Sequence, residues 1–377
     1  MRVLIIHNQL WTHYKAKLFS EIHTNFPYQK GEFLVAQIGL YEKSRATFGD
    51  LDYSIHQYPY QLLFDKSLQE ITFIERLKAL FSTITNFKPT VVNFTGYYDL
   101  ATWPLIFYCK LKGIKLVLSN ESTSADQSRS FFKELIKKII IMQFDVFFCF
   151  GTKSAKYLET FGVKSNQIAV TNAAVVDNDR IEAEYKKAVQ SISKNNFGAA
   201  YNLREKNFIF VGRFVEVKNL SLLIRAFSKL NDLKWGLILL GNGQEESNLK
   251  NQISVNKIDG ITFISSQKWT EIPQFLALGN IFVLPSFSET WGLVVNEAMV
   301  CGLPVIVSDQ CGCSFDLIEG KNTGEIFKSN DVNDLLKKMI ALKDKDLTIY
   351  AENAKKQILR YSPKSAAQAM IKAFENL

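Results

Sequence analysis

Short apolar stretches alternate with longer amphipathic stretches along this chain, and the alternation predicts its fold class. In the first half, runs rich in β-branched and aromatic residues have the length of buried strands, and the segments between them have helical spacing. Helices are expected at 67–86 and 100–112, each followed by a Lys-Pro or Lys-Gly breaker. Strands are expected at 3–7, 34–38, 90–94, 115–119 and 146–150. This alternation is typical of a parallel sheet covered on both faces.

The second half repeats the pattern with more continuous apolar runs. Its expected strands lie at 208–211, 235–240, 261–264, 281–284 and 304–307. The fold class predicted is therefore α/β, with two Rossmann-like doubly wound domains facing across a cleft. Ligands of such sheets bind at the carboxyl ends of the strands.

Domain boundaries follow from the stretch 181–206, which is polar and charged and has no strand-like run. We expect an acceptor-binding domain at 1–180, a linker at 181–206 and a second domain at 207–355. The remaining residues, 356–377, have helical spacing after a break at Ser362 and Pro363, and are expected to pack back on the first domain.

Composition narrows the possible partners. The chain has 377 residues, of which 47% are hydrophobic, and 45 Lys and Arg against 37 Asp and Glu give a net charge of +8. This excess is spread along the chain, so it favours a small anionic substrate or a membrane surface, and we expect no nucleic acid partner. The longest apolar runs, of about five residues, are far shorter than a signal-peptide core or the roughly 20 residues of a membrane span. We expect a cytoplasmic protein.

Cysteines and histidines give no sign of a metal site. The five cysteines are scattered, several of them inside apolar runs, and we expect reduced thiols. The four histidines lack metal-ligand spacing, and Cys311-Gly-Cys313 is too short to bind zinc alone. We therefore predict neither a metal nor a resident cofactor.

A nicotinamide dehydrogenase is excluded by the loops that follow the strands. Such an enzyme needs G-x-G-x-x-G directly after a strand. The stretch 7–13 contains no glycine, and Gly241 and Gly243 are followed at the required position by Glu246.

The most informative segment is 285–304, where a strand gives way to a polar loop and then to a helix that begins near Gly292. Free amides at a helix start bind phosphate, and here they belong to Gly292, Leu293 and Val294. Glu289 precedes the helix and Glu297 lies inside it, so the two carboxylates can bracket sugar hydroxyls. The alternative is that Glu289 only satisfies the helix dipole and Glu297 faces solvent. The apolar neighbours of Glu297 favour burial, which requires partners.

A second segment, 208–220, places Gly212, Arg213 and Lys218 between a strand and a helix. Two cations there can neutralise a diphosphate as it gains charge on leaving. They can also be ordinary surface charges. The turn Gly241-Asn242-Gly243 follows the next strand and suits packing against a nucleoside.

Together these motifs resemble the family-4 retaining glycosyltransferases of GT-B fold, within the glycosyl transferases group 1. The resemblance rests on 211–218, on 240–243, and on Glu289 and Glu297 with seven residues between them. It implies a metal-independent, hexosyltransferase-like enzyme with a nucleoside-diphosphate sugar as donor, UDP-sugar being favoured over GDP-sugar. By similarity, Arg213 and Lys218 contact the diphosphate, Glu289 the transferred sugar and Glu297 the ribose. The other donor contacts implied are Gly212, Gly241, Asn242, Gly243, Gln267, Lys268, Thr290, Trp291, Gly292, Leu293 and Val294.

The first domain is expected to bind the acceptor, a saccharide or a lipid-linked saccharide. Candidate contacts are Asn8, Trp11, His13, Tyr14, Lys15, Asp126 and Arg129. The rival interpretation is that Tyr14 and its neighbours merely seat the first helix. Many relatives carry a histidine where this chain has Glu121, so the resemblance assigns Glu121 to catalysis. Alternatively, Glu121 forms a structural ion pair with Arg129.

The helix that follows Arg129 leaves its role open. It presents Phe132, Leu135, Ile136, Ile139 and Ile140 on one side, with Arg129, Lys133, Lys137 and Lys138 around the other. Such a helix can lie on an anionic membrane, giving peripheral contact at the inner face of the cell membrane, or pack on its own sheet. The predicted function is sugar transfer in polysaccharide or glycolipid assembly. The alternatives are a nucleotide-sugar 2-epimerase of the same fold and a catalytically inactive sugar-nucleotide-binding protein.

Overall fold

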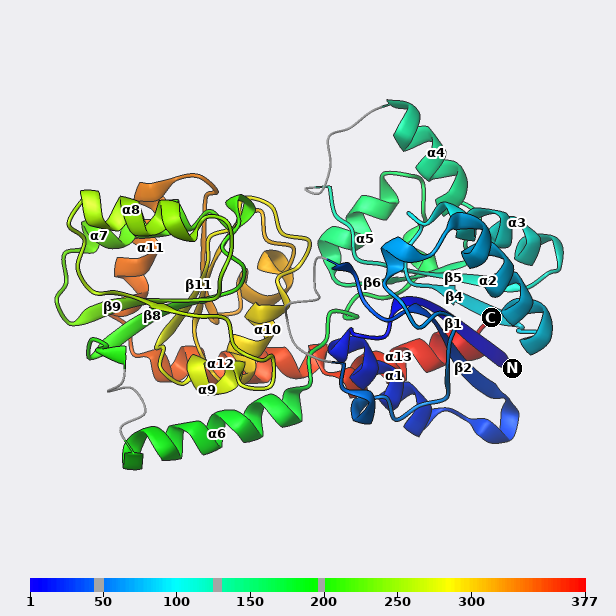
Figure 1. Cartoon of the computed structure of the whole chain (residues 1–377), viewed down its shortest axis with the longest axis horizontal. Helices are drawn as coiled ribbons and strands as arrows, with labels where there is room; N and C mark the ends of the chain where they lie inside the picture. Colours follow the sequence, from blue (N-terminus) through cyan, green and yellow to red (C-terminus); the bar gives the residue numbers. More distant parts are fainter. Residues whose placement is uncertain (44–50, 125–130, 196–200) are drawn as a thin grey trace. The chain divides into compact units, whose positions relative to one another are not determined.

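In the computed structural model, the residues described are 1–43, 51–124, 131–195 and 201–377. They form two compact units, each with its own parallel sheet (Figure 1). The first unit consists of Met1–Val176 and Tyr361–Leu377, and the second of Asp177–Arg360.

The first unit has a seven-stranded sheet in the order β3-β2-β1-β4-β5-β6-β7, with every neighbouring pair parallel. The order reverses between β1 and β4, where Leu4 lies opposite Leu34 on one side and Val92 on the other. The strands are β1 Arg2–Gln9, β2 Glu32–Gly39, β3 Tyr60–Leu62, β4 Val91–Phe94, β5 Lys115–Asn120, β6 Val146–Cys149 and β7 Ile168–Val170.

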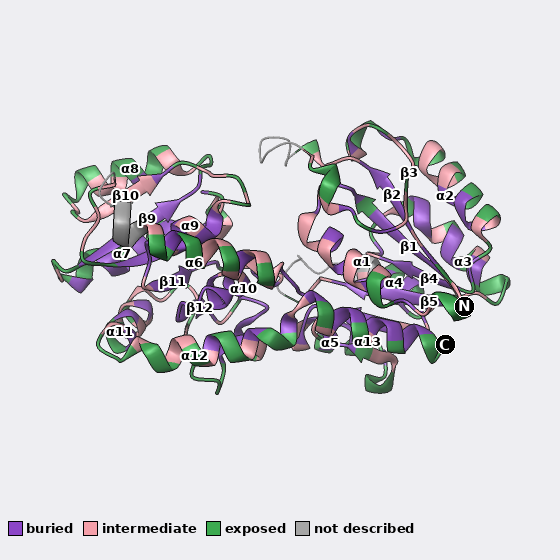
Figure 2. Cartoon of the chain, turned by 90° about the horizontal axis from the view of Figure 1, so that it is seen from below, coloured by how far each residue is buried: buried purple, intermediate pink, exposed green. Residues whose placement is uncertain are grey.

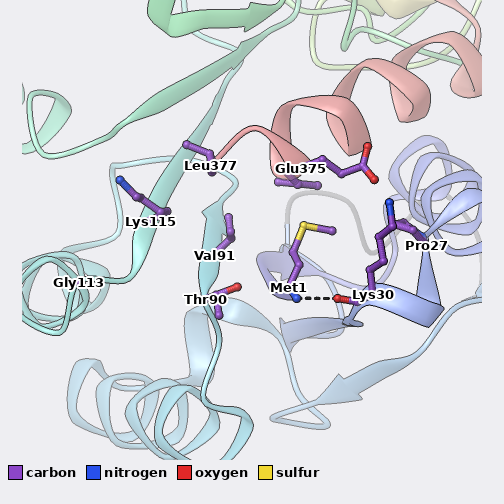
Figure 3. Close-up of a pocket in the computed structure, with 10 residues that line it drawn as sticks. Met1, Pro27, Lys30, Thr90, Val91, Gly113, Lys115, Glu375 and Leu377 are labelled. Atoms are coloured by element: carbon purple, nitrogen blue, oxygen red, sulfur yellow. Dashed lines mark hydrogen bonds between the residues drawn. The ribbon is translucent and has the colours of Figure 1, made fainter.

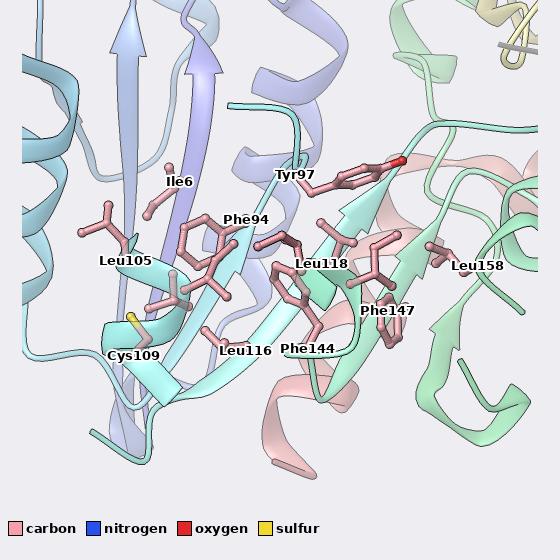
Figure 4. Packing of buried hydrophobic residues seen from close by; sticks show 14 of the residues in the cluster. Ile6, Phe94, Tyr97, Leu105, Cys109, Leu116, Leu118, Phe144, Phe147 and Leu158 are labelled. Atoms are coloured by element: carbon pink, nitrogen blue, oxygen red, sulfur yellow. The ribbon is translucent and has the colours of Figure 1, made fainter. Parts of the chain in front are cut away.

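Helices cover both faces of this sheet. They are α1 His13–Asn25, α2 Phe73–Phe87, α3 Trp103–Leu111, α4 Phe131–Ile141, α5 Thr152–Glu159 and α13 Pro363–Glu375. Buried side chains of α2 to α5 form one core with alternate strand residues such as Phe94, Leu116 and Phe147 (Figure 4). On the other face α13 packs on α1 and β7, and Phe148 meets Phe374 at 5.4 Å between ring centroids.

The ends of α2 show how local sequence sets the helices. Thr72 and Glu75 form a capping box, in which the Thr72 side chain accepts a hydrogen bond from the Glu75 amide. The helix therefore begins at Phe73, later than the predicted residue 67, and a short 3₁₀ turn occupies 68–70. Lys88 ends it in the left-handed conformation, immediately before Pro89.

The second unit has a six-stranded parallel sheet in the order β10-β9-β8-β11-β12-β13. The order again reverses once, between β8 and β11. The strands are β8 Lys206–Val211, β9 Trp235–Leu240, β10 Ile261–Ile264, β11 Ile281–Leu284, β12 Val305–Ser308 and β13 Gly324–Phe327. Three of them, β9, β10 and β11, have the predicted bounds.

The helices of the second unit also form two groups. The first is α7 Leu220–Leu230, α8 Glu246–Val255 and α11 Val332–Lys343, with α7 in contact with both others. The second is α6 Asn178–Asn195, α9 Ile272–Leu276, α10 Leu293–Val300 and α12 Leu347–Ile358, held together around α10. Figure 2 shows that the strands of both units are largely buried and that exposure is concentrated on the outer sides of the helices.

The expected linker at 181–206 differs most from the structure. Residues 178–195 form α6, which packs on α9 and α10 inside the second unit. Its inward positions include Ile181 and Ala188, seven residues apart, as one face of a helix requires. The stretch lacks a strand, but it has helical periodicity, and its charges lie mostly on the outer side.

Both boundaries of the first unit also differ from those expected from the sequence. The first unit ends at Val176 and resumes at Tyr361, compared with the expected 180 and 356. Ser362 caps α13 by accepting a hydrogen bond from the Ser365 amide at 3.2 Å, with Pro363 at the first helical position. Asn172 donates to the Ser365 hydroxyl at 3.2 Å, which ties the stretch after β7 to α13.

Candidate functional site

Two loops meet where the strand order of the second unit reverses. One follows β8 and carries Arg213 and Lys218, and the other follows β11 and carries Glu289. Because β8 and β11 are neighbours and parallel, both loops leave the same edge of the sheet. In open α/β sheets this crevice is where ligands bind.

Lys218 and Glu289 form an ion pair, with each side chain only 17% exposed. The backbone fixes both partners. The Phe287 amide donates to the Val217 carbonyl at 3.1 Å, and the Gly312 amide donates to the Glu289 carbonyl at 2.9 Å. From sequence, Lys218 was expected to contact the donor diphosphate and Glu289 the transferred sugar. In the structure the two side chains contact each other.

Arg213 lies in the same loop and is exposed. The glycine turn of 241–243 supports this loop through its backbone: the Phe214 amide donates to the Asn242 carbonyl at 2.6 Å. A Cβ on Gly241 would lie 1.9 Å from the Gly212 carbonyl oxygen, so only glycine permits this approach. The observed role of the turn is thus to position the loop that carries the cations.

The amino end of α10 lies directly after Glu289. Gly292 precedes the helix with φ +94°, a backbone conformation that other residues rarely adopt. Thr290, Leu293 and Val294 are half-exposed. Trp291 differs, since its ring is buried and its Nε1 donates to the Asn296 Oδ1 at 2.8 Å. The Trp291 side chain therefore belongs to the core, and only its backbone adjoins the candidate site.

Glu297 sits deeper on α10 and has an unusual environment. Desolvation by burial raises its pKa to about 7, and the nearby Arg180 acts in the opposite direction. Arg180 comes from α6, lies 4.3 Å above the centre of the Trp269 ring, and donates through Nη1 to the Thr270 carbonyl at 3.3 Å. Sequence analysis missed both residues: it placed a domain boundary after Arg180 and did not predict α6, and it considered only the neighbours of Trp269, Gln267 and Lys268.

The segment before α9 was expected to hold a nucleotide base through its backbone. The Gln267 side chain donates to the Ser265 carbonyl at 3.0 Å, while the Lys268 amide donates to Glu271 at 3.3 Å. Asn242 reaches the same segment through a 3.0 Å bond to the Ser266 hydroxyl. Asn242, Gln267 and Lys268 thus share one neighbourhood beside Trp269.

In the first unit, Lys15 and Glu121 form an ion pair of 2.8 Å. The Lys15 side chain is 5% exposed and its ammonium lies 4.8 Å from the centre of the Phe150 ring, whereas Glu121 is 41% exposed. The recorded partner of Glu121 is therefore Lys15. Arg129, the partner considered from sequence, and Asp126 lie outside the described residues.

Aromatic residues surround this pair. The rings of Trp11 and His13 lie 6.0 Å apart edge to face, as do those of His13 and Tyr14 at 5.9 Å. Tyr14 also contacts Lys15, whose ammonium lies 5.6 Å from its ring centre. Asn8 is exposed at the end of β1. The aromatic residues therefore form one group with Lys15, partly on the surface and partly seating α1.

A chain of buried hydrogen bonds runs under this group. His7 Nδ1 bonds to Gln37 Oε1 at 2.9 Å, Gln37 Nε2 donates to the Tyr58 hydroxyl at 2.9 Å, and that hydroxyl bonds to His56 Nδ1 at 2.7 Å. Because the Gln37 oxygen can only accept, Nδ1 of His7 carries the proton. Burial lowers the pKa of His7 and of His56 to about 4, so both are neutral near pH 7.

A cavity of about 460 Å³ in the first unit lies away from all these residues (Figure 3). Its lining includes Met1, Val91 and Lys115, which stand at the amino ends of their strands. Ligands of parallel sheets bind at the opposite edge. We therefore place no function in this cavity.

Searches for metal and membrane features covered only the described residues. Within these, no group of three or more His, Cys, Asp and Glu side chains is arranged to hold a metal ion. Over the same part of the chain, every helix is too short or too polar to span a bilayer. All five cysteines are buried, and none forms a disulfide.

Comparison with known proteins gives consistent matches. Residues 191–358 match the sequence model of the family described as glycosyl transferases group 1. An uncharacterized glycosyltransferase of Methanocaldococcus jannaschii is 26% identical over 59% of this chain and 63% of its own length. The N,N'-diacetylbacillosaminyl-diphospho-undecaprenol alpha-1,3-N-acetylgalactosaminyltransferase of Campylobacter jejuni is 26% identical over 59% of this chain and 58% of its own length. The matched region thus spans less than two thirds of either relative.

A solved structure supports the fold of the whole chain. The structure of HepE from Anabaena in complex with UDP aligns over 100% of both chains with a TM-score of 0.74 and 18% identity. This similarity establishes the architecture, two Rossmann-like units of the GT-B type.

Proposed function

We propose, from the match of residues 191–358 to the glycosyl transferases group 1, that the chain transfers a sugar from a nucleoside-diphosphate sugar to an acceptor hydroxyl. The reaction proposed retains the configuration of the anomeric carbon and needs no metal. Its place would be polysaccharide or glycolipid assembly on the cytoplasmic side of a cell membrane.

The observation that carries this proposal is the convergence of Arg213, Lys218 and Glu289 beside the amino end of α10, where the sheet order reverses. The two cations and the α10 amides would stabilise the departing diphosphate, whose charge grows in the transition state. Glu289 would accept hydrogen bonds from hydroxyls of the transferred sugar. Lys218 can then contact the diphosphate and also hold Glu289 in position, because it already forms an ion pair with Glu289.

The inner part of the donor site would be formed by Glu297 and the segment before α9. Glu297 would accept hydrogen bonds from the ribose hydroxyls, and the backbone near Gln267 and Lys268 would hold the base. The HepE structure contains UDP, which makes UDP-sugars the first donors to test.

The acceptor site would be formed by the first unit. The exposed carboxylate of Glu121 and the aromatic group around Trp11 suit a polyhydroxylated acceptor. The Campylobacter jejuni relative acts, by its name, on a diphospho-undecaprenol saccharide. A lipid-linked saccharide is therefore the first acceptor class to test, with a free saccharide as the second.

The proposal is tested by screening donors for thermal stabilisation and then analysing products. UDP-sugars and GDP-sugars are compared for their effect on Tm, since a ligand that binds only the folded state raises it. The best donor is then incubated with candidate acceptors, and the anomeric configuration of the product is read by NMR. An inverted product would refute retention, and the absence of any donor binding would refute the donor site.

Two controls separate this proposal from its rivals. Incubation with the sugar nucleotide alone detects a 2-epimerase, which needs no acceptor, and a binding protein would give a thermal shift with no product. Addition of EDTA should leave transfer largely intact. Loss of transfer that a divalent ion restores would show that a metal, and not the cations with α10, neutralises the diphosphate.

A further inference from the structure

Helix α4 presents its apolar side to the outside of the first unit. Leu135, Ile136, Ile139 and Met142 are each between 44% and 51% exposed, and we call them the α4 face. At 3.6 residues per turn they cover an arc of about 120°. An ordinary surface helix turns an arc of this width toward the core.

The inward side of α4 explains why the helix cannot simply rotate. Ile140 and Ile141 are buried in the core of the unit, and so is Lys137. The Lys137 ammonium donates to Glu134 at 2.8 Å and to the Tyr157 hydroxyl at 3.4 Å. Rotation that buried the α4 face would break these bonds and expose both isoleucines. The outward position of the α4 face is therefore fixed by packing.

Neighbouring helices of the same layer also expose apolar residues. Phe107 and Leu111 of α3 are exposed, as is Phe81 of α2, whose ring contacts Tyr108 at 5.0 Å. The two helices α3 and α4 are joined by Lys110, which contacts Asp145 in the turn after α4 at 2.9 Å. Extended exposure of this kind marks a surface that binds a partner.

Charge identifies the kind of partner. The sequences of α2, α3 and α4 contain six basic and two acidic residues. Both acidic residues are engaged locally: Glu75 caps its own helix and Glu134 pairs with Lys137. Arg76 and Lys110 are paired with Asp99 and Asp145, whereas Lys78 and Lys138 are exposed. The layer therefore presents apolar and positively charged groups together.

An anionic lipid surface fits this combination. Apolar side chains enter the boundary between headgroups and acyl chains, while lysines meet lipid phosphates. A second copy of this chain fits poorly, because a symmetric contact would bring two basic surfaces together. We propose that the α4 face docks the first unit on an anionic bilayer. Binding itself does not depend on the transferase activity, although the benefit of reaching a lipid-linked acceptor does rest on the proposed function.

The test is flotation of the full chain with vesicles of phosphatidylcholine alone or mixed with phosphatidylglycerol. The chain should float with the mixed vesicles and much less with the neutral ones. Ile139→Glu should weaken this binding by about tenfold or more, because a charge replaces an inserted apolar group. Lys138→Gln should weaken binding to the mixed vesicles only. The matched control is Ile349→Glu, at an exposed isoleucine of α12 in the second unit, which should bind like the parent.

Further readouts keep the outcomes distinct. Circular dichroism and Tm verify that each variant is folded, and transfer to a short water-soluble acceptor should be equal in Ile139→Glu and the parent. If neither the parent nor the variants transferred sugar, the proposed function would be refuted, and the docking surface would not be affected. Unchanged flotation of Ile139→Glu overturns the docking surface. So does a change of oligomeric state in Ile139→Glu without vesicles, which would assign the face to contact between copies.

Discussion

Each unit places a lysine and a glutamate together beyond the ends of its strands, but the two ion pairs are built differently. In the second unit, Lys218 and Glu289 are equally shielded, and backbone bonds join or fix their loops. In the first unit, Lys15 is almost fully buried against Phe150, and Glu121 is the partner that meets solvent.

This difference predicts different roles for the two ion pairs. A buried ammonium is destabilising without its counter-ion, so the pair with Glu121 stabilises the first unit while the Glu121 carboxylate still meets solvent. Lys218 and Glu289 lie in loops that meet where the strand order reverses, and the exposed Arg213 lies in the same loop as Lys218, which is where a ligand of such a sheet is expected. The second pair should therefore govern turnover, and the first should affect both turnover and stability.

The largest expected effect is at the cations of the second unit. Lys218→Ala or Arg213→Ala should lower turnover on the order of 10²-fold or more, the usual cost of losing one transition-state donor. Steady-state kinetics at saturating donor and acceptor measure this, with Tm as the test of folding. If the double variant kept near-normal turnover, the second pair would be merely structural and the comparison would fail.

Next in size is Glu121→Gln, which keeps an oxygen that can accept the Lys15 hydrogen bond. Turnover should fall by about 10²-fold or less if the carboxylate acts on the acceptor. Tm should also fall slightly, because the buried Lys15 ammonium keeps a hydrogen-bond acceptor but loses its counter-ion. Lys15→Met is the matched variant, and it should lower Tm because both the ion pair with Glu121 and the contact of the ammonium with the Phe150 ring are lost. Equal losses of Tm in both variants, with turnover per folded molecule preserved, would make Glu121 structural.

A smaller effect concerns Glu297, the half-buried glutamate of α10. If its ionised form accepts ribose hydrogen bonds, donor affinity should rise by about tenfold as pH rises through 7, given its raised pKa. Arg180→Gln removes the opposing cation and should move this midpoint to higher pH, although Asp177, Glu184 and Cys301 also lie near Arg180. Glu297→Gln should abolish the dependence. Calorimetric titration with the donor across pH measures all three.

The smallest effect concerns the buried histidines of the first unit. His7 and His56 have pKa values of about 4 in the folded chain, compared with 6.5 when exposed. The unfolded chain therefore binds more protons between these values, so the unfolding free energy should fall as pH drops from 6.5 to 4. Tm measured across this window should fall less steeply in His56→Phe. An identical slope would show that His56 does not titrate as its burial suggests.

The sheets could be predicted from sequence except at three of their four edge strands. The central strands are continuous apolar runs because both of their faces are buried. The missed strands, β3, β7 and β13, each stand at the edge of a sheet. Their residues are partly exposed and include polar or small side chains, so no apolar run marks them.

The residues of the candidate site could be predicted from sequence, but the contacts between them could not. Residues after strands, such as Lys218 and Glu289, are marked by the alternation of strand and loop. That these two touch depends on β8 and β11 being neighbours, which is set by tertiary packing. Arg180 was missed for a further reason. The many polar residues of α6 made the stretch look like a linker, so the helix that carries Arg180 was not predicted.

The return of α13 to the first unit has a consequence for synthesis. Residues 177–360 form the second unit as one uninterrupted stretch, whereas the first unit is complete only when 361–377 has been added. A chain leaving the ribosome can therefore finish its second unit while the first still exposes the surface of α1 and Phe148 that α13 covers. The unit whose strands are translated first is thus the last to be completed.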